Sequence, residues 1–297
     1  MKKPFLGIAF GGGGFRGAAH IGVLQVLQKN GINAEIVSGV SAGSIVAAMY
    51  ALKLDPFWIE KKFRETLVST KFKKVSNSII KNKNQKSLSN YIPEKWLQYF
   101  LAIISLNKKY IVKNKPLKEM LKLLLKDNHF KDLKIPLKVI ATDINNGQDI
   151  LYDSGNLIDS ILRSSSIPGV IEPLIKDGKV IVDGGVGLPI PVSAIKNHCE
   201  FVIAIDIGLY KLKPIKNLNA ASIKKRSNII TSNRLKERLA SEADFVIKPD
   251  TMGSEWSNLD NAEKIFENGK IAAEESIALL REKMEKKKKQ IGFTKNG

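Results

Sequence analysis

The order of apolar and amphipathic segments predicts an α/β fold with a mainly parallel central sheet. Short apolar runs such as 5–10 and 201–206 have the length of buried strands, and longer periodic segments such as 18–28 stand between them. Strands that alternate with helices are typical of a sheet covered by helices. The chain has 297 residues, 43% of them hydrophobic, which is enough for a full core. No repeat or clear linker divides it, so we expect a single domain over residues 1–297.

The elements are expected in a regular succession. Strand 5–10 leads through four glycines into helix 18–28, and strand 36–37 leads through residues 38–44 into helix 45–54. Residues 70–90 are rich in Lys, Asn and Ser, which indicates a loop. The remaining expected elements are helix 57–67, helix 117–125, strand 137–143 with its neighbour 150–152 across a turn, helix 158–165, strands 179–182, 201–206 and 245–247, a helix around 235–240, and a long C-terminal helix over 261–289.

The net charge of +19 favours an anionic partner, either membrane lipid or nucleic acid, although a lysine-rich solvated surface would give the same balance. No nucleic-acid-binding motif is present, so we expect no nucleic acid partner. The apolar patch Trp96–Ile104, flanked by lysines, is either a helix packed on the core or a lid that faces a membrane. Together with the basic run Lys286–Lys289, it predicts peripheral contact with an anionic membrane.

The remaining composition narrows the chemistry and the compartment. No run of about 18 apolar residues could span a membrane. The one cysteine, Cys199, excludes an internal disulfide and fits a reducing compartment, so we expect a cytoplasmic protein, peripheral to the membrane at most. Three histidines and one cysteine leave little for a zinc site, and no calcium loop is present. We therefore expect no metal and no cofactor.

Residues 38–44 carry the first chemical signal. Gly39-Val40-Ser41-Ala42-Gly43 stands between a strand-like run and an apolar helix, which is the setting of a nucleophile elbow. A serine that attacks an ester must project from a tight turn, and small neighbours leave room for it. The helix that follows directs the positive end of its dipole at developing negative charge. Ser41 is therefore the candidate nucleophile, although a small-residue turn without chemistry shares the pattern.

The run of four glycines after the first strand is the second signal. Residues 12–17 also fit the dinucleotide fingerprint G-x-G-x-x-G. That fingerprint requires an acid at the far end of the second strand, where this chain has Ser41, and Glu35 comes before the strand. A Walker A loop is absent because no Lys-Ser/Thr pair follows the glycines. We expect the backbone N–H groups of this loop to form an oxyanion hole for Ser41.

The third signal is Asp183-Gly184-Gly185, which follows an apolar strand. Ser41 needs a base, and an acid at a strand end with two glycines clearing the space around it is a strong candidate. His20 lies on the largely apolar helix after the glycine loop, and we interpret it as a packed histidine. Asp143 and Asp206 also end strands, and we interpret them as structural acids.

In this order, the three motifs resemble those of the patatin-like phospholipases. The glycine loop 12–17, the serine motif 39–43 and the aspartate motif 183–185 carry the resemblance, and blocks 139–143, 163–169 and 243–250 look like those of bacterial members. The resemblance covers almost the whole chain and is weakest over residues 70–110. It implies a three-layer α/β/α fold in which about 70–110 is a variable, lid-like insertion and the C-terminal helix is basic.

The resemblance also implies a mechanism, a Ser-Asp dyad that needs no histidine. Asp183 would take the proton from Ser41, and Ser41 would attack the carbonyl of a phospholipid or another acyl ester, as in a phospholipase A or a lysophospholipase. The oxyanion site would comprise Gly12, Gly13, Gly14 and Arg16, with backbone N–H groups around Gly13 and Gly14 as donors and Arg16 fixing the loop. The chain departs from the family at residues 186–191, where many members carry asparagines before a Leu-Pro. This leaves open how the loop around Asp183 is braced.

Two other classes of function stay open. An α/β-hydrolase would use Ser41, Asp183 and His198, but its elbow follows several strands and here only the second, and His198 precedes a strand rather than following one. A non-catalytic nucleotide- or membrane-binding protein would use the glycine loop alone, and would leave Ser41 and Asp183 without a role.

Overall fold

The computed structural model describes residues 3–68, 110, 112–215, 217–255 and 261–292. Within these residues, eight strands form one sheet in the order β5-β6-β3-β2-β1-β7-β8, and β4 pairs with β3 off this path. The strands are β1 (Leu6–Phe10), β2 (Ile36–Val40), β3 (Leu137–Asp143), β4 (Gln148–Tyr152), β5 (Leu174–Lys176), β6 (Lys179–Asp183), β7 (Phe201–Ile205) and β8 (Phe245–Ile247).

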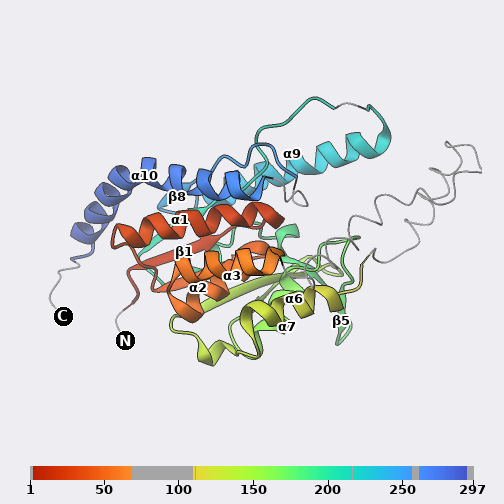
Figure 1. The fold of residues 1–297 in the computed structure, drawn as a ribbon, viewed down its shortest axis with the longest axis horizontal. Helices are drawn as coiled ribbons and strands as arrows, with labels where there is room; N and C mark the ends of the chain where they lie inside the picture. The colour runs from red at the N-terminus through yellow and green to blue at the C-terminus, as the bar shows by residue number, and fades with distance from the viewer. Residues whose placement is uncertain (1–2, 69–109, 111, 216, 256–260, 293–297) are drawn as a thin grey trace, which may run out of the picture.

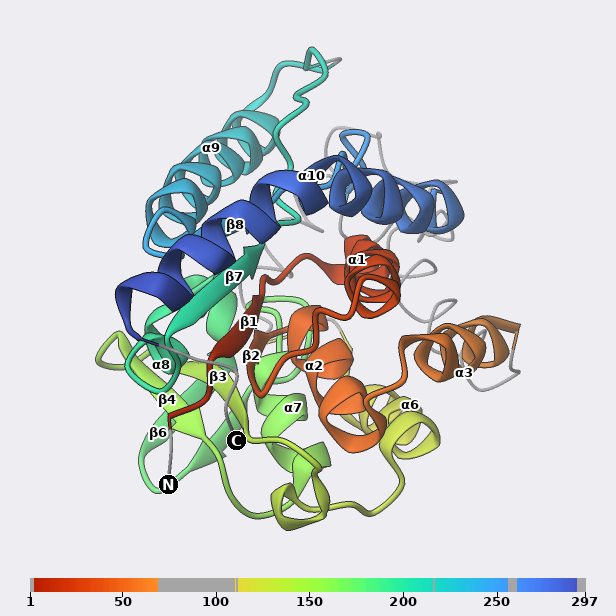
Figure 2. The ribbon, with the colours of Figure 1, turned by 90° about the vertical axis from the view of Figure 1, so that its left-hand side faces the viewer.

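Helices cover both faces of this sheet, as Figures 1 and 2 show. Helices α1, α2 and α7 lie on one face with α3 and α6 outside them, and α8 and α9 lie on the other, so the predicted three layers are confirmed. The helices are α1 (Ala18–Lys29), α2 (Ala42–Lys53), α3 (Pro56–Val68), α6 (Lys115–Leu125), α7 (Leu157–Ser164), α8 (Ser193–Lys196), α9 (Ala220–Ala240) and α10 (Ala262–Gln290), with 3-10 turns η1 (Gly14–Gly17), η2 (Phe130–Asp132) and η3 (Gly184–Val186).

The core has two parts because side chains alternate along each strand. Ile8 and Phe10 of β1 point into the large cluster beneath α1, α2 and α10. Ala9, between them, points to the opposite face, where it packs with residues of α8 and with Ala240 of α9. β1 and β7 are therefore buried on both sides, which explains why their sequences contain no polar side chain.

The direction of the strands differs across the sheet. The strands from β8 through β7, β1 and β2 to β3 run parallel, whereas β4 and β6 pair with β3 in the antiparallel direction and β5 pairs with β6. The expected turn between 137–143 and 150–152 is confirmed. Strand 179–183 belongs to a hairpin whose first strand, Leu174–Lys176, had no distinct sequence signal, so its antiparallel direction was not anticipated.

Helix α9 differs most from the expectation, because it begins at Ala220 rather than near residue 235. Its first four turns are polar and lack a clear apolar stripe, so periodicity gives no sign of them. Local capping starts the helix instead: the Asn219 side chain accepts from the Ser222 N–H at 2.9 Å, and the Ser222 hydroxyl accepts from the Asn219 N–H at 3.0 Å.

Helix α1, which follows the glycine loop, is held by close contact with α10. A Cβ atom on Gly22 would lie 2.2 Å from the Phe266 carbonyl oxygen, and one on Gly269 would lie 2.2 Å from that of Ala19. Only glycines allow the two backbones to approach this closely. The contact fixes the helix on which the loop ends.

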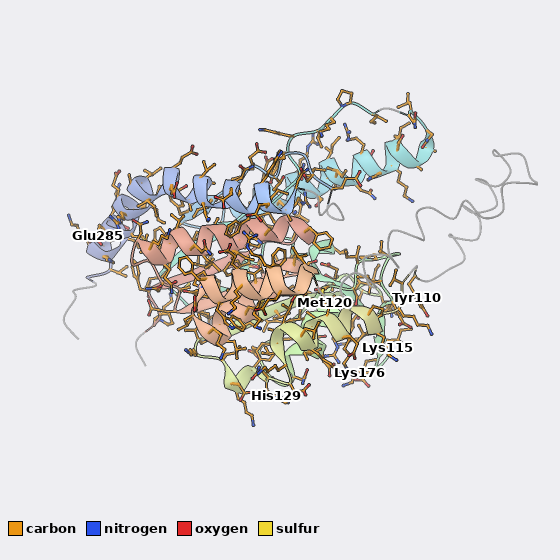
Figure 3. All side chains as sticks on the ribbon, viewed as in Figure 1. Tyr110, Lys115, Met120, His129, Lys176 and Glu285 are labelled. Carbon is orange, nitrogen blue, oxygen red and sulfur yellow. The ribbon has the colours of Figure 1, made fainter. Side chains whose placement is uncertain are left out.

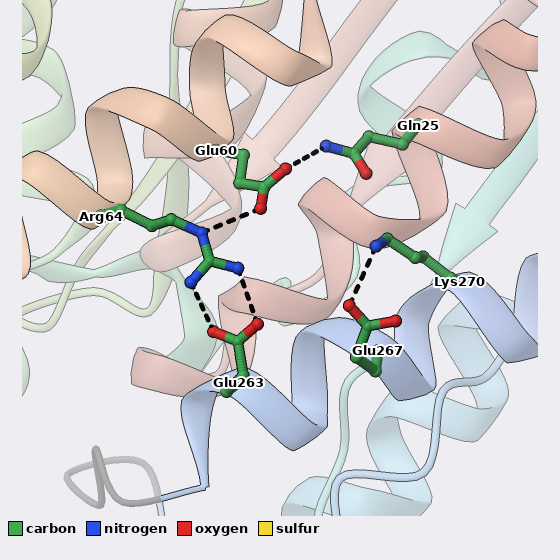
Figure 4. Close-up of polar contacts among 6 residues, drawn as sticks. All are labelled: Gln25, Glu60, Arg64, Glu263, Glu267 and Lys270. Atoms are coloured by element: carbon green, nitrogen blue, oxygen red, sulfur yellow. Dashed lines mark hydrogen bonds and ion pairs between the residues drawn. The ribbon is translucent and has the colours of Figure 1, made fainter.

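A network of polar side chains ties α3 to the same pair of helices (Figure 4). Gln25 of α1 donates to Glu60 of α3 at 2.7 Å, and Arg64 of α3 donates from Nε to Glu60 at 2.9 Å. Arg64 also binds both carboxylate oxygens of Glu263 on α10, at 2.6 and 2.7 Å. A bidentate pair of this kind fixes orientation as well as distance. The three helices therefore form one support on this face of the sheet.

The basic end of α10 lies at the amino edge of the parallel strands. Lys287 Nζ is 3.5 Å from Asp244, which precedes β8, and Lys288 Nζ is 5.3 Å from the ring of Phe5, which precedes β1. Glu285, next to this basic run, and Tyr110 lie at opposite ends of the molecule (Figure 3). The patch Trp96–Ile104 and nearly all of the predicted insertion lie outside the described residues. None of the described helices is long and apolar enough to cross a bilayer.

Candidate active site

Ser41 stands in a sharp turn between β2 and α2. Its φ of 54° and ψ of −130° are strained for a residue with a side chain. The flanking glycines are required by contact. A Cβ atom on Gly43 would lie 2.3 Å from the Phe10 carbonyl oxygen, and one on Gly39 would lie 2.6 Å from that of Gly43. The elbow predicted from the sequence is therefore present, and backbone packing accounts for the spacing of its glycines.

The backbone of Ser41 is tied to the end of α7. Its N–H donates to the Ser164 hydroxyl at 2.9 Å, while the Ser44 hydroxyl donates to the Ser41 carbonyl at 2.6 Å. The side chain of Ser41 is 7% exposed. These bonds hold the backbone of the turn in place, and neither of them uses the Ser41 hydroxyl.

Asp183 reaches Ser41 through the register of the sheet. Val40 of β2 pairs with Ile140 of β3, and Asp183 of β6 pairs with Ala141, the next residue of β3. The Ser41 side chain lies close enough to the Asp183 carboxylate to lower its pKa, and both residues line the same cavity. The two candidate residues therefore meet, although 141 residues of chain separate them.

The environment of Asp183 suits a base. Burial raises its pKa to about 6, and the Ser41 side chain, the Gly185 N–H and the charge of Lys236 act in the opposite direction. The Gly185 N–H donates to Oδ1 at 2.8 Å, and the Asp183 N–H donates to the Ser166 carbonyl at 2.9 Å. A carboxylate with this pKa is ionised at neutral pH and more basic than an exposed one.

The glycine loop lies against the elbow. A Cβ atom on Gly12 would be 3.3 Å from the Ser41 Cβ. The N–H groups of Gly11 and Gly12 are already used, by the carbonyls of Ile205 and Pro189 at 3.1 and 3.0 Å. Within the described part of the chain, the next two N–H groups, of Gly13 and Gly14, donate to no acceptor. The loop thus presents two free backbone donors next to Ser41.

Arg16 is buried under this loop. Its Nε donates to the Gly13 carbonyl at 3.0 Å, which agrees with the predicted role of fixing the loop. Burial lowers its pKa to about 10, although the nearby charge of Asp206 favours the charged form. The Asp206 carboxylate accepts from the Gly208 N–H and from the Tyr210 hydroxyl, which agrees with its interpretation as a structural acid.

Asp143 also has a structural role, and His20 is packed. Asp143 Oδ1 accepts from the N–H groups of Asn145 and Val180 at 3.1 and 3.2 Å, which closes the turn after β3. His20 is fully buried, and its Nε2 lies 2.8 Å from the Gly11 carbonyl. Burial lowers the pKa of His20 to about 4, so the ring is neutral and Nε2 is the donor.

Lys236 of α9 also belongs to the site, and the sequence analysis did not single it out. Its Nζ donates to the Gly12 carbonyl at 2.9 Å, and it is 5% exposed. Burial lowers its pKa to about 8. A lysine within a helix carries no pattern that distinguishes it, and although a helix around 235–240 was expected, nothing in the sequence indicated that it lies over the glycine loop.

A cavity of about 680 Å³ opens over these groups. On one side the lining is mainly apolar and comes from the loops after α7 and β6; on the other it is a polar, partly basic face of α9. The residues that line it are Gly12, Gly13, Gly14, Arg16, Ser41, Ile167, Pro168, Asp183, Gly185, Val186, Pro189, Leu209, Ala221, Lys224, Lys225, Asn228, Ile229, Ser232, Asn233, Lys236 and Glu255.

The loop after Asp183, which departs from the family pattern, is braced by backbone contacts. The Pro189 carbonyl accepts from the Gly12 N–H at 3.0 Å, and the Pro191 carbonyl accepts from the Ser38 hydroxyl at 2.7 Å. A Cβ atom on Gly187 would lie 2.3 Å from the Asp149 carboxylate. The loop is therefore anchored to β1, β2 and β4 without the asparagines.

The alternative with a histidine triad does not fit the geometry. His198 precedes β7, and its Nε2 lies 2.7 Å from Lys138, near the start of β3. Ser41 follows the end of β2, which runs parallel to β3, so the two residues lie at opposite edges of the sheet. Among the described residues, no group of three His, Cys, Asp or Glu side chains is arranged to hold a metal ion.

Comparisons with known proteins agree with this geometry. The sequence model of the patatin-like phospholipase family matches residues 8–195. An uncharacterised NTE family protein of Mycobacterium bovis is 26% identical over 73% of this chain and 52% of its own length. The neuropathy target esterase sws of Drosophila melanogaster is 27% identical over 68% of this chain and 13% of its own length.

The chain therefore spans about half the length of the mycobacterial relative and a small part of the insect one. Among solved structures, human GIVD cytosolic phospholipase A2 matches with a TM-score of 0.54 and 11% identity, over 96% of this chain and 60% of that one. At this identity the likeness supports the fold alone.

Proposed function

The chain belongs to the patatin-like phospholipase family, and we propose that it hydrolyses acyl esters of lipids with Ser41 as nucleophile and Asp183 as base. One observation carries this proposal: the Ser41 side chain, held in a strained turn, faces a buried carboxylate whose pKa is raised to about 6. A nucleophile within reach of a base of suitable pKa is the arrangement that acyl transfer requires.

In the first step, Asp183 removes the proton from the Ser41 hydroxyl as Oγ attacks the ester carbonyl. The carbonyl oxygen becomes an oxyanion, and we assign its binding to the N–H groups of Gly13 and Gly14, which donate to no acceptor among the described residues. When the tetrahedral intermediate collapses, the bond to the alcohol oxygen breaks and Asp183 returns its proton to that oxygen. The products are a free alcohol and an acyl-Ser41.

In the second step, water attacks the acyl-Ser41. Asp183 takes a proton from the water, the same donors bind the second oxyanion, and the bond from Ser41 Oγ to the acyl carbon breaks. Asp183 then protonates Ser41 Oγ. His20 and His198 have no part in either step, because the first is packed against Phe10 and the second lies at the other edge of the sheet.

The lining of the cavity supports an amphiphilic substrate. Ile167, Pro168 and Val186 offer apolar contact, and Val186 is 47% exposed. The opposite side carries Lys224 and Lys225 of α9. Phospholipids and lysophospholipids combine an acyl chain with an anionic group, so either class matches this division.

We propose that peripheral contact with a membrane is made by the amino-terminal end of α9, not by Lys286–Lys289. Figure 1 shows this end of α9 projecting from the body. Leu218, two residues before the helix, is 77% exposed, and Ile223, in its first turn, is 48% exposed. Exposed apolar side chains beside lysines suit the surface of an anionic bilayer. The basic run at the end of α10 faces the opposite edge of the sheet from Ser41.

A cytoplasmic location stays a prediction based on the single cysteine. The proposed function itself is tested by labelling. A fluorophosphonate probe should form an adduct with the protein, and peptide mass spectrometry should place the adduct on Ser41. Labelling should be lost in Ser41→Ala and retained in Ser241→Ala, a matched exposed serine at the end of α9. An adduct on another residue would overturn the proposed nucleophile.

A further inference from the structure

The lysine above the glycine loop is unusual because it is charged and yet buried. Lys236 lies on α9, beyond residues 8–195, and is 5% exposed. Long cationic side chains normally keep their charge in water. A buried ammonium therefore requires partners that compensate for the lost hydration.

Its hydrogen bond fixes one peptide of the oxyanion loop. Nζ donates to the Gly12 carbonyl at 2.9 Å. The Gly12–Gly13 peptide is planar and trans, so the Gly13 N–H points away from the lysine. Gly13 lines the cavity, and within the described residues its N–H donates to no acceptor. The lysine thus holds the peptide whose donor serves the proposed oxyanion.

Charged groups from three elements surround the ammonium. Arg16 of η1 repels it, while Asp206 at the end of β7 and Asp183 of β6 attract it. The charge of Lys236 also lowers the pKa of His20 on α1, but the His20 ring is neutral. Asp206 is committed to Gly208 and Tyr210. Asp183, by contrast, faces Ser41 and has one described backbone donor, and the charge of Lys236 lowers its pKa.

We propose that Lys236 is a positioning residue of the hydrolase site, which fixes the Gly12–Gly13 peptide through its hydrogen bond and keeps Asp183 ionised through its charge. This inference rests on the proposed function of Ser41 and Asp183. It concerns a residue that acts through the loop and the base and does not touch the reacting atoms.

Three substitutions separate the hydrogen bond from the charge. Lys236→Met removes both, Lys236→Gln keeps a donor without the charge, and Lys236→Arg keeps both. Arg234→Met is the matched control, because it removes one positive charge from an exposed position of the same helix. Thermal melts of all four variants report whether the fold is intact.

Two measurements are made on each folded variant. The first is the pH profile of kcat/KM on a p-nitrophenyl ester. The second is a 13C NMR titration of aspartate carboxyl groups, in which Asp183→Asn identifies the signal of Asp183. In Lys236→Met and in Lys236→Gln, both measurements should show that the pKa of Asp183 is raised by about one unit relative to the parent protein. Lys236→Arg and Arg234→Met should match the parent protein.

The hydrogen bond is read from kcat at a pH where Asp183 is fully ionised. Lys236→Met should lose about tenfold in kcat there, and Lys236→Gln should lose less because it can still donate to Gly12. An unchanged Asp183 titration in a folded, uncharged variant would overturn the proposal. The proposal would also be overturned if Lys236→Met and Lys236→Gln were unfolded while Lys236→Arg was folded, since the lysine would then stabilise the fold.

The NMR titration needs no activity, so it separates this inference from the proposed function. If the protein has no esterase activity but its Asp183 signal still shifts in Lys236→Met, the proposed function is contradicted and the coupling between Lys236 and Asp183 is retained. An active protein whose Asp183 signal does not shift in Lys236→Met would retain the proposed function and contradict the coupling between Lys236 and Asp183.

Discussion

Ser41 and Asp183 approach each other across the end of a single strand, β3. The residue before Ser41 pairs with Ile140, and Asp183 pairs with the adjacent Ala141 from the antiparallel side. A parallel strand and an antiparallel strand thus deliver the two side chains to the same place. The relative position of the proposed nucleophile and base is set by the hydrogen bonds of the sheet rather than by a flexible loop.

Replacing Ser41 should abolish activity in two variants with different stability. We expect Ser41→Ala and Ser41→Gly both to lose at least about a thousandfold in kcat on a p-nitrophenyl ester, because neither has a nucleophile. The free energy of unfolding of Ser41→Gly should be about 1 kcal/mol larger than that of Ser41→Ala, since glycine adopts the positive φ without strain. Urea denaturation measures this difference. Activity in either folded variant would remove Ser41 as the nucleophile.

Asp183→Asn should reduce kcat nearly as far as the loss of Ser41, and the double variant should be little worse than either single one. Residues that act as a unit give losses that do not add. Steady-state kinetics of the three variants test this. Additive losses on a logarithmic scale would mean that the two side chains act separately.

The same substitution should stabilise the protein at neutral pH. Burial raises the pKa of Asp183 to about 6 in the folded state, so folding costs free energy once the carboxyl is ionised. Above pH 6 the free energy of unfolding of Asp183→Asn should exceed that of the parent protein by roughly 3 kcal/mol. This difference should decrease from pH 6 to pH 4 and should vanish below pH 4. Urea denaturation at several pH values measures it. A gain that grew as the pH fell would contradict the raised pKa.

The pH dependence of activity should follow the same group. Asp183 must be ionised to act as a base, so kcat/KM should rise through about pH 6 and reach a plateau above pH 7. His198→Gln should leave both the profile and kcat unchanged, because His198 lies beside Lys138 at the opposite edge of the sheet. Loss of activity in His198→Gln would restore the triad as the better account.

Membrane contact should depend on the projecting end of α9. Leu218→Ser combined with Ile223→Ser should weaken binding to anionic vesicles severalfold and leave hydrolysis of a soluble ester intact, since both side chains are exposed. Ile271→Ser combined with Leu279→Ser is the control, because these two residues of α10 are also exposed apolar side chains, at 50% and 51%. Vesicle sedimentation at low and high salt measures both. Equal loss in the control pair would argue against a specific surface on α9.

The sequence alone predicted the parts of the site that follow from local geometry. The elbow at Ser41 and the glycine loop are short segments whose residues must be small because atoms of other residues lie within van der Waals distance, so their spacing is visible in the chain. The central strands β1 and β7 were predicted for a similar reason, because burial on both faces makes them apolar throughout.

Other parts depend on contacts that no local pattern reports. The antiparallel direction of β6 follows from its hairpin with the three-residue strand β5, which is too short to be recognised. Lys236 lies in the part of α9 that the sequence did predict, but its contact with the Gly12 carbonyl joins residues 224 positions apart. Both are tertiary effects, and one of them supplies a buried charge to the site.

The position of β7 beside β1 has a consequence for how the chain folds during synthesis. β1 is synthesised long before one of its two neighbours, β7, which is complete only at Ile205. Until then the apolar strand β1 has an open edge, which favours association with other chains. A fragment ending at residue 195 would keep Ser41 and Asp183 but never close that edge. We therefore expect a fragment of residues 1–195 to aggregate, because the edge of β1 that β7 covers would stay exposed.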